Sequence, residues 1–327
     1  MRILIVGTFD NYWSTNIEMA RSFRNIGHEV IIFDYRKYQK SPKFFMKIID
    51  KIFSNLRRYR IIGFISYKIY TRILKRIKIA NFLKKKIHDE NPDLIWLCKT
   101  DTLAVDKLKK YQNKIVYYFM DPVVKANKIR TDIISSFCQY SISTFGYVHK
   151  NHMKSTFNRH NIQGVNKSRF YKFNDWDKRL NRIIFVSNIS HKRYEFVKQI
   201  KSLGIPIDCY GLGWENKAIY GTELNETYNK YKYALNICQD EFGFSVRVQQ
   251  SLCAGCILFS ETCNDLEEMN FLSKNLILYI NLNDFLKKWN HRPILRKQDN
   301  LDYLTWESIL KSDLDWIKNY QINSVEK

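Results

Sequence analysis

The sequence predicts an α/β protein of two domains, each built around a parallel β-sheet, and three observations support this prediction. The chain opens with a short apolar run at Arg2–Gly7, followed by a helical segment and a second apolar run at Glu29–Asp34. Such runs are typical of strands that are buried on both faces of a parallel sheet. The same alternation restarts near residue 173, and a chain of 327 residues is long enough for two domains.

The first half of the chain continues the pattern with three further predicted strands. They lie at Leu94–Cys98, Ile115–Asp121 and Tyr140–Phe145, and helical segments separate them. Alternating strands and helices of this kind are typical of a doubly wound sheet. We therefore predict a Rossmann-like first domain over residues 1–172.

The second half repeats the alternation. Strands are predicted at residues 183–187, 207–211, 235–238 and 256–260, and helices at residues 195–203, 228–234 and 246–253. This pattern predicts a second Rossmann-like domain over residues 173–299. In residues 300–327, apolar side chains recur at helical spacing, which predicts a terminal helix that packs back on the body of the protein. Two such domains are expected to face each other across a cleft that holds the ligands.

The composition excludes several classes of protein. Hydrophobic residues make up 45% of the chain and aromatic residues 15%, which is too much apolar material for a disordered protein. The amino-terminal segment lacks a signal-peptide pattern, and no uncharged apolar run reaches the roughly 18 residues of a membrane-spanning helix. The seven cysteines are an odd number and lie mostly in apolar runs, so we expect reduced, buried thiols in a cytoplasmic protein.

The positive charge is concentrated in one segment. The chain has a net charge of +22, and seventeen Lys and Arg residues but a single acidic residue lie between Arg36 and Lys86. Apolar residues at helical spacing, over 44–56 and 61–77, predict that the segment 36–88 forms two basic amphipathic helices inserted in the first domain. The candidate contacts to a membrane or polyanion are Lys43, Lys47, Lys51, Arg57, Arg58, Arg72, Lys75 and Arg76.

Three interpretations of this segment compete. A basic helix with an apolar face can bind an anionic membrane surface, with about 1 kcal/mol from each Lys or Arg near the lipid. A strongly basic face can also follow the phosphates of a nucleic acid. In the third interpretation the apolar stripes are core or dimer contacts and the basic face is simply solvated. The apolar stripes favour the membrane, because phosphate contact alone does not require them.

Two segments of the second half have the features of an anion or nucleotide site. Lys192 and Arg193 lie where a helix is predicted to begin, and backbone N–H groups at a helix start attract anions. Gly211 and Gly213 follow the next predicted strand, where they would let the backbone approach a flat ligand closely. A simple tight turn would explain these two glycines equally well.

The most informative block is Ser245–Glu261, SVRVQQSLCAGCILFSE, which indicates a short helix, a glycine turn and a buried strand. Arg247 and Gln250 are three residues apart and therefore share one face of the predicted helix. There an arginine can bind phosphate and the neighbouring polar side chain can bind sugar hydroxyls. An ordinary exposed helix would have the same spacing.

This block resembles the R-x-[FY]-E-x-x-x-[AC]-G segment of GT-B glycosyltransferases, and is most similar to the group-1 and spore-maturation (CgeB-like) kinds. The segments Gly27–Asp34 (GHEVIIFD) and Cys209–Trp214 (CYGLGW) also match that family in order and spacing. The resemblance implies transfer of a hexose or related sugar from a nucleotide-diphosphate sugar, most often a UDP-sugar, to a hydroxyl. It implies no metal ion and no cofactor besides this co-substrate.

The resemblance also assigns roles to the residues of the second domain. Arg193 and Arg247, with Lys192 beside them, would hold the donor diphosphate, and Gly211 and Gly213 would lie against the nucleoside. Gln250 stands where the family usually has a glutamate that binds the ribose hydroxyls. A neutral amide lacks the two charged acceptors of a carboxylate, which puts donor affinity and nucleotide preference in question.

Two acidic residues are candidates for the catalytic groups. Glu241 lies one residue away from the position where the family often has an acid close to the transferred sugar. Asp121 ends the predicted strand Ile115–Asp121, and a carboxylate there could deprotonate the acceptor hydroxyl. A carboxylate that only caps a turn before Pro122 is the alternative. No D-x-D is placed as a metal site, since Asp313 and Asp315 lie in the predicted terminal helix.

Taken with the basic segment, these features predict a cytoplasmic glycosyltransferase that binds peripherally to the inner face of the membrane. Its acceptor would be a membrane-associated surface glycan or a lipid-linked saccharide. A phage-type enzyme that glycosylates a hydroxylated base in DNA is the alternative, in which case the basic segment binds nucleic acid. A second alternative, favoured by Gln250, is an inactive binding protein of the same fold.

Overall fold

The computed structural model describes residues 1–38, 64–98, 103–238, 241–268, 273–297 and 299–325. The chain divides into two compact units. Unit 1 comprises Met1–Thr144 and Val148–His160, and unit 2 comprises Phe145–Tyr147 and Asn161–Lys327.

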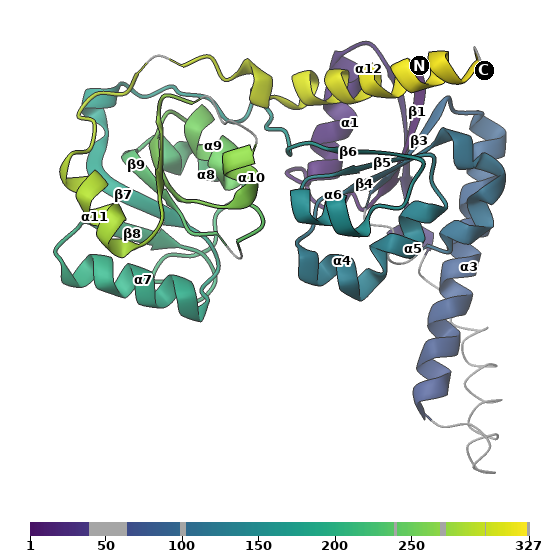
Figure 1. Cartoon of the computed structure of the whole chain (residues 1–327), viewed down its shortest axis with the longest axis horizontal. Helices are drawn as coiled ribbons and strands as arrows, with labels where there is room; N and C mark the ends of the chain where they lie inside the picture. Colours follow the sequence, from purple (N-terminus) through teal and green to yellow (C-terminus); the bar gives the residue numbers. More distant parts are fainter. Residues whose placement is uncertain (39–63, 99–102, 239–240, 269–272, 298, 326–327) are drawn as a thin grey trace. The chain divides into compact units, whose positions relative to one another are not determined.

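Unit 1 contains a six-stranded parallel sheet with the strand order β2-β1-β3-β4-β5-β6 (Figure 1). The strands are β1 (Arg2–Gly7), β2 (Glu29–Asp34), β3 (Leu94–Cys98), β4 (Ile115–Phe119), β5 (Tyr140–Ser143) and β6 (Phe157–His160). Every residue of β3, β4 and β5 is buried, and for β3 and β4 the uninterrupted apolar runs predict this. β6 lies at the edge of the sheet and was not anticipated from the sequence, because none of its four residues is fully buried and they include Asn158 and Arg159.

The helices of the first part of the chain are α1 (Thr15–Asn25), α3 (Phe64–Glu90), α4 (Val123–Ile129), α5 (Thr131–Ser136) and α6 (Gly146–His152). Two 3₁₀ segments, η1 (Tyr35–Tyr38) and η2 (Val105–Lys114), complete this part. α3 contains the second of the two predicted basic helices, and the first lies outside the described residues. The carboxyl-terminal half of α3 packs through Ile79, Leu83 and Ile87, and its amino-terminal half projects from the body of unit 1 (Figure 1).

Unit 2 contains a five-stranded parallel sheet with the strand order β11-β10-β9-β7-β8. The strands are β7 (Leu180–Val186), β8 (Ile207–Tyr210), β9 (Tyr231–Asn236), β10 (Ile257–Glu261) and β11 (Leu276–Tyr279). The helices are α7 (His191–Ser202), α8 (Gly221–Tyr228), α9 (Arg247–Cys253), α10 (Asn264–Glu268), α11 (Leu282–Asn290) and α12 (Trp306–Val325), with 3₁₀ segments η3 (Trp176–Lys178) and η4 (Asp302–Leu304).

The helix predicted at residues 228–234 is wrong. α8 ends at Tyr228, and residues 231–234 form the first part of β9. The buried Asn229 fixes this change of direction, because its side chain donates to the carbonyl oxygen of Tyr171 and accepts from Arg179 Nη2. β9 is a central strand between β10 and β7, so its tyrosines pack in the interior of the sheet. Aromatic residues are enriched in strands, which favours the strand conformation here.

Residues 161–172, which the sequence analysis assigns to the first domain, belong to unit 2. Val165 and Phe170 are buried in a core cluster of unit 2, and Val165 N donates to Leu304 O at 2.9 Å. The segment is therefore held by the second core, and strand periodicity cannot detect this because the segment forms no regular strand. The predicted terminal helix is α12, which is also part of unit 2.

Each sheet has one point at which the strand order reverses. In unit 1 the chain passes from β1 to β2 on one side and reaches β3 on the other side of β1. In unit 2 the same reversal occurs around β7, between β8 and β9. In open α/β sheets, ligands bind beyond the carboxyl ends of the strands at such points. None of the helices in the described part of the chain is long and apolar enough to cross a membrane.

Candidate functional site

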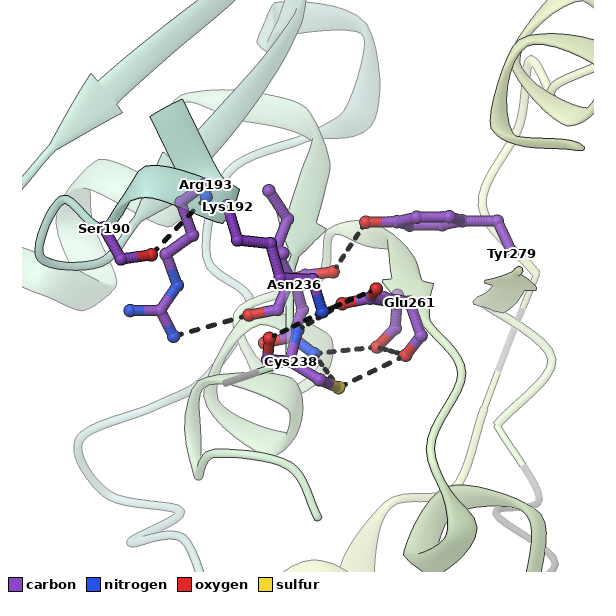
Figure 2. Close-up of polar contacts among 9 residues, drawn as sticks. Ser190, Lys192, Arg193, Asn236, Cys238, Glu261 and Tyr279 are labelled. Atoms are coloured by element: carbon purple, nitrogen blue, oxygen red, sulfur yellow. Dashed lines mark hydrogen bonds and ion pairs between the residues drawn. The ribbon is translucent and has the colours of Figure 1, made fainter. Parts of the chain in front are cut away.

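Arg193 lies at the point in unit 2 where the strand order reverses. The side chain of Ser190 caps α7 and accepts a hydrogen bond from Arg193 N, as Figure 2 shows. The Arg193 guanidinium donates from Nη1 to Asn188 O at 3.2 Å and from Nη2 to Ile237 O at 3.4 Å. Asn188 follows β7 and Ile237 follows β9, so Arg193 connects the two loops that border the reversal.

Arg247 is the second cation of this site. It is the first residue of α9, and its side chain makes no hydrogen bond or ion pair with any described residue. The Nε atoms of Arg193 and Arg247 are both buried without a hydrogen-bond partner among the described residues. Burial lowers the pKa of Arg193, and the positive charge of Arg247 lowers it further. Two like charges with unsatisfied donors form a site that an anion would stabilise.

Lys192 has a different environment. Its Nζ lies 2.8 Å from the carboxylate of Glu261 and donates to Cys238 O at 3.3 Å (Figure 2). Glu261 also accepts a hydrogen bond from Cys238 N at 2.9 Å, and so joins the ends of β9 and β10. The charge of Lys192 is therefore already compensated within unit 2, whereas no acidic partner contacts Arg247 in the described residues.

Glu261 is not among the site residues predicted from the sequence. It is the last residue of β10 and of the block that resembles glycosyltransferases. The available signal was its place at the carboxyl end of a predicted buried strand. Its partner Lys192 is distant in the sequence, and only the packing of the strands in the sheet brings the two together.

Gly211 and Gly213 have a structural reason to be glycine. Both have a positive φ, +140° at Gly211 and +89° at Gly213. A Cβ at Gly211 would collide with the carbonyl oxygen of Ser187, and a Cβ at Gly213 would collide with the side chain of Ile189. Ile189 N also donates to Leu212 O at 2.9 Å. The two glycines thus let the loop after β8 pack on the loop after β7. Their contact with a nucleoside stays a prediction.

Gln250 and Gln249 differ in environment although they are neighbours on α9. Gln250 is half-buried, and its amide makes no hydrogen bond to the described residues, so it can bind a ligand. Gln249 is buried, donates from Nε2 to Gln163 O at 3.3 Å, and leaves Oε1 without a hydrogen-bond partner there. The Gln249 side chain is therefore part of the packed interior of unit 2, in contrast to that of Gln250.

The two candidate catalytic acids belong to different units. Asp121 of unit 1 is half-buried and lies two residues beyond β4, directly before Pro122 and α4. The strand is therefore shorter than the predicted Ile115–Asp121. Glu241 of unit 2 is exposed, and its carbonyl oxygen accepts a hydrogen bond from Asn264 N at 3.0 Å.

Most of the predicted membrane or polyanion contacts fall outside what the structure describes. Lys43, Lys47, Lys51, Arg57 and Arg58 lie outside the described residues, and Arg72 is in α3 but its side chain is not described. Lys75 is exposed. Arg76 donates from Nη2 to Leu103 O at 3.2 Å, so part of its hydrogen-bonding capacity is used within unit 1.

The cysteines form no disulfide; all seven lie in the described part of the chain. Cys256 is buried and Cys253 is half-buried, and burial raises the pKa of both thiols to about 12. Thiols of this kind are protonated at neutral pH and react slowly. Cys253 and Cys256 form a C-x-x-C spacing, which core packing therefore explains.

The comparisons with known proteins agree with this geometry. Residues 192–298, which include Arg193 and Arg247, match the family model described as glycosyl transferase-like. No curated protein matches the chain significantly. Sucrose-phosphate synthase from Thermosynechococcus elongatus superposes with a TM-score of 0.61 over 98% of this chain and 99% of that one, at 11% identity. The chain has the GT-B fold.

Two other solved structures give similar superpositions. HepE from Anabaena, in complex with UDP and glucose, has a TM-score of 0.54 and 12% identity, covering 100% of this chain and 99% of that one. UDP-GlcNAc 2-epimerase from Methanocaldococcus jannaschii also has a TM-score of 0.54, at 10% identity, covering 98% and 100% of the two chains. Since an epimerase shares the fold, the GT-B architecture alone does not decide the reaction.

Proposed function

We propose that this protein is a glycosyltransferase that moves a sugar from a nucleotide-diphosphate donor to a hydroxyl acceptor. The observation that supports this most directly is the pair Arg193 and Arg247 at the strand-order reversal of unit 2. Both side chains are half-buried, and each has a buried Nε–H without a hydrogen-bond partner among the described residues. A diphosphate is the ligand that matches two such groups, because each guanidinium forms strong, charge-assisted hydrogen bonds to phosphate oxygens.

The same two arginines would assist the reaction. When the bond between the sugar and the diphosphate breaks, negative charge develops on the leaving phosphate oxygen. Donors that are already oriented toward that charge stabilise the transition state more than the ground state. The positive charge of Lys192 would add to this stabilisation, although Lys192 also forms an ion pair with Glu261.

The donor is proposed to be a UDP-sugar. HepE, which has the same fold, binds UDP and glucose in its crystal structure. In this chain Gln250 is available to bind the ribose through its amide, and the loops after β7 and β8 would lie along the nucleoside. Similarity to the group-1 and CgeB-like kinds is part of the same proposal.

The acceptor hydroxyl is proposed to be deprotonated by Asp121, with Glu241 close to the transferred sugar. Asp121 lies beyond the carboxyl end of β4, which is the edge of the unit 1 sheet where ligands of parallel sheets bind. A positioned carboxylate that accepts the proton of the attacking hydroxyl increases the rate typically by two to four orders of magnitude. No metal ion is required in this scheme.

The acceptor is proposed to be a glycan or lipid-linked saccharide at an anionic membrane surface, where the protein binds peripherally from the cytoplasm. Seventeen basic residues and one acidic residue between Arg36 and Lys86 support this proposal. In the described part of this segment, Leu74 and Lys75 are exposed on the projecting half of α3. Apolar and basic side chains on one projecting helix suit a membrane better than a nucleic acid.

A thermal-shift screen with UDP, GDP, CMP, dTDP and ADP and their common sugars tests the donor. We expect one nucleotide to raise the melting temperature, since a ligand that binds only the folded state stabilises it. The protein is then incubated with the sugar conjugate of the nucleotide that binds, once with and once without membrane extract. The products are analysed by NMR. Conversion of the sugar without any acceptor would indicate an epimerase, and binding without any turnover would indicate an inactive binding protein.

A further inference from the structure

The loop between β1 and α1 in unit 1 is held in a defined conformation. Asn16 donates from Nδ2 to Thr8 O at 3.0 Å, across the base of the loop. Gly7 allows this contact, because a Cβ at that position would collide with the Asn16 amide. Near the tip, Ser14 N donates to Asn11 O at 2.9 Å, and the Ser14 side chain caps α1. An ion pair between Asp10 and Arg36 fastens the loop to the segment after β2.

This anchored loop exposes two aromatic side chains. Tyr12 is 50% exposed and Trp13 is 37% exposed. Their ring centroids lie 4.7 Å apart with an interplanar angle of 85°, so the two rings form a corner rather than a stack. Single exposed apolar residues are common, whereas Tyr and Trp, which combine an apolar ring with a polar group, are enriched at binding interfaces.

The loop lies at the edge of the unit 1 sheet where ligands of parallel sheets bind. It follows β1, at the point where the strand order of the unit 1 sheet reverses between β2 and β3. The strands of this sheet are all parallel, so the loop emerges from the same edge as the segment that carries Asp121 after β4. Ligands of such sheets bind along this edge.

We propose that Tyr12 and Trp13 form a saccharide platform, and that the acceptor hydroxyl therefore belongs to a sugar. This inference rests on the proposed glycosyltransferase activity. A pyranose ring presents C–H groups on its faces and hydroxyls at its rim, and it fits a corner of two perpendicular rings with carboxylate and amide groups beside it, here those of Asp10 and Asn11. A flat nucleobase is instead held by parallel rings that cover its face.

Saturation-transfer NMR tests the platform directly, with methyl glycosides of glucose, galactose, mannose, rhamnose and N-acetylglucosamine as probes. We expect at least one glycoside to receive saturation at its ring C–H protons. Trp13→Ala should weaken its Kd about tenfold, and Tyr12→Ala by a similar factor, whereas Trp13→Phe retains most of the binding. Tyr303→Ala is the matched control, since Tyr303 is 39% exposed in unit 2.

Equal glycoside affinity in wild type and Trp13→Ala overturns the proposal, and so does the failure of every glycoside to bind the wild-type protein. Trp13-dependent saturation of the base in a hydroxymethylated oligonucleotide would overturn it in favour of a nucleic-acid acceptor. A UDP thermal shift measured on the same samples separates this inference from the proposed function. If UDP still binds Trp13→Ala but no glycoside binds the wild type, only the saccharide platform is rejected. If no nucleotide shifts the melting temperature of the wild type, the proposed donor site is rejected.

Discussion

The charge of Arg247 acts on Arg193: burial lowers the pKa of the Arg193 guanidinium, and the nearby guanidinium of Arg247 lowers it further. A guanidinium is not deprotonated in proteins, so both side chains carry a positive charge at neutral pH. Each also has a buried Nε without a hydrogen-bond partner among the described residues. The folded protein thus keeps two repelling cations together, which is a cost that a bound diphosphate would remove.

Replacing Arg247 by alanine should abolish most donor binding and leave the fold intact. Its side chain makes no hydrogen bond to the described residues, so little is lost within unit 2. The lost bonds to phosphate are worth about 1.5–3 kcal/mol, which weakens the Kd for the nucleotide about tenfold to a hundredfold. Calorimetric titration with UDP measures this, or with whichever nucleotide the screen selects.

Lys198→Ala is the control for this variant, because Lys198 is exposed on α7 and its removal changes the net charge equally. It should bind the nucleotide as the wild type does. Equal binding by Arg247→Ala and Lys198→Ala would show that Arg247 does not contact the diphosphate.

Gly211→Ala should destabilise unit 2 far more than Gly204→Ala. Both glycines have a positive φ, but a Cβ at Gly211 would collide with Ser187 O, and a Cβ at Gly204 has nothing within 4 Å. We expect a loss of about 1 kcal/mol at Gly204 from backbone strain alone, and about 3 kcal/mol or more at Gly211. Urea unfolding of both variants provides the comparison, and equal losses would contradict the packing of the two loops.

Asp208→Asn should remove a pH-dependent part of the stability. Asp208 of β8 accepts hydrogen bonds from Arg182 Nε at 2.9 Å and from Tyr231 Oη at 2.9 Å. The hydrogen bond from Arg182 is the main reason that the pKa of Asp208 lies below its usual 3.8. A carboxylate with a lowered pKa stabilises the fold above its unfolded pKa, and this contribution is lost as the pH falls through the folded value.

The wild type should therefore be more stable than Asp208→Asn by about 1 kcal/mol at pH 7, after allowance for solvent screening. The difference should shrink as the pH falls below about 4. Chemical unfolding at a series of pH values measures it. A difference that stays constant down to pH 3 would mean that Asp208 does not titrate with a lowered pKa.

Asp121→Asn should lower turnover about a hundredfold or more without changing nucleotide affinity, as expected for a general base. The amide keeps the size of the side chain and one acceptor oxygen, but it replaces the second acceptor by an NH2 donor and cannot take the proton of the hydroxyl. Steady-state kinetics with the identified donor and acceptor, together with UDP titration, separate the two effects. Full activity of this variant would leave Asp121 only the role of capping the turn before Pro122.

Neutralising the basic segment should release the protein from anionic vesicles. The test variant changes five residues to glutamine: Lys43, Lys47, Lys51, Arg57 and Arg58. If two of them reach the lipid, at about 1 kcal/mol each, vesicle partitioning falls about 30-fold. In the control variant, five exposed lysines of unit 2 are changed to glutamine in the same way: Lys172, Lys198, Lys217, Lys230 and Lys297. The same fall in both variants would indicate attraction by net charge alone.

Strand positions followed from the sequence wherever a strand is fully buried. The apolar runs at β1, β3 and β4 contain almost no polar residue, because both faces of a central parallel strand pack against helices or other core residues. β9 is the exception, since Tyr231 and Tyr233 continue the spacing of the preceding helix α8. Buried Asn229 ends that helix through bonds to Tyr171 and Arg179, which no local pattern contains.

The sequence by itself determined the two parallel-sheet units, the helix starts that present Arg193 and Arg247, and the segment that holds the basic charge. These features are local, because periodicity and capping depend on residues within one or two turns. Tertiary structure decided which side chains meet. The strand order β10-β9-β7 brings Glu261 to Lys192 and leaves Arg247 near Arg193 without an acidic partner in the described residues. Contacts between loops depend on which strands are neighbours in the sheet, and spacing along the chain does not encode that order.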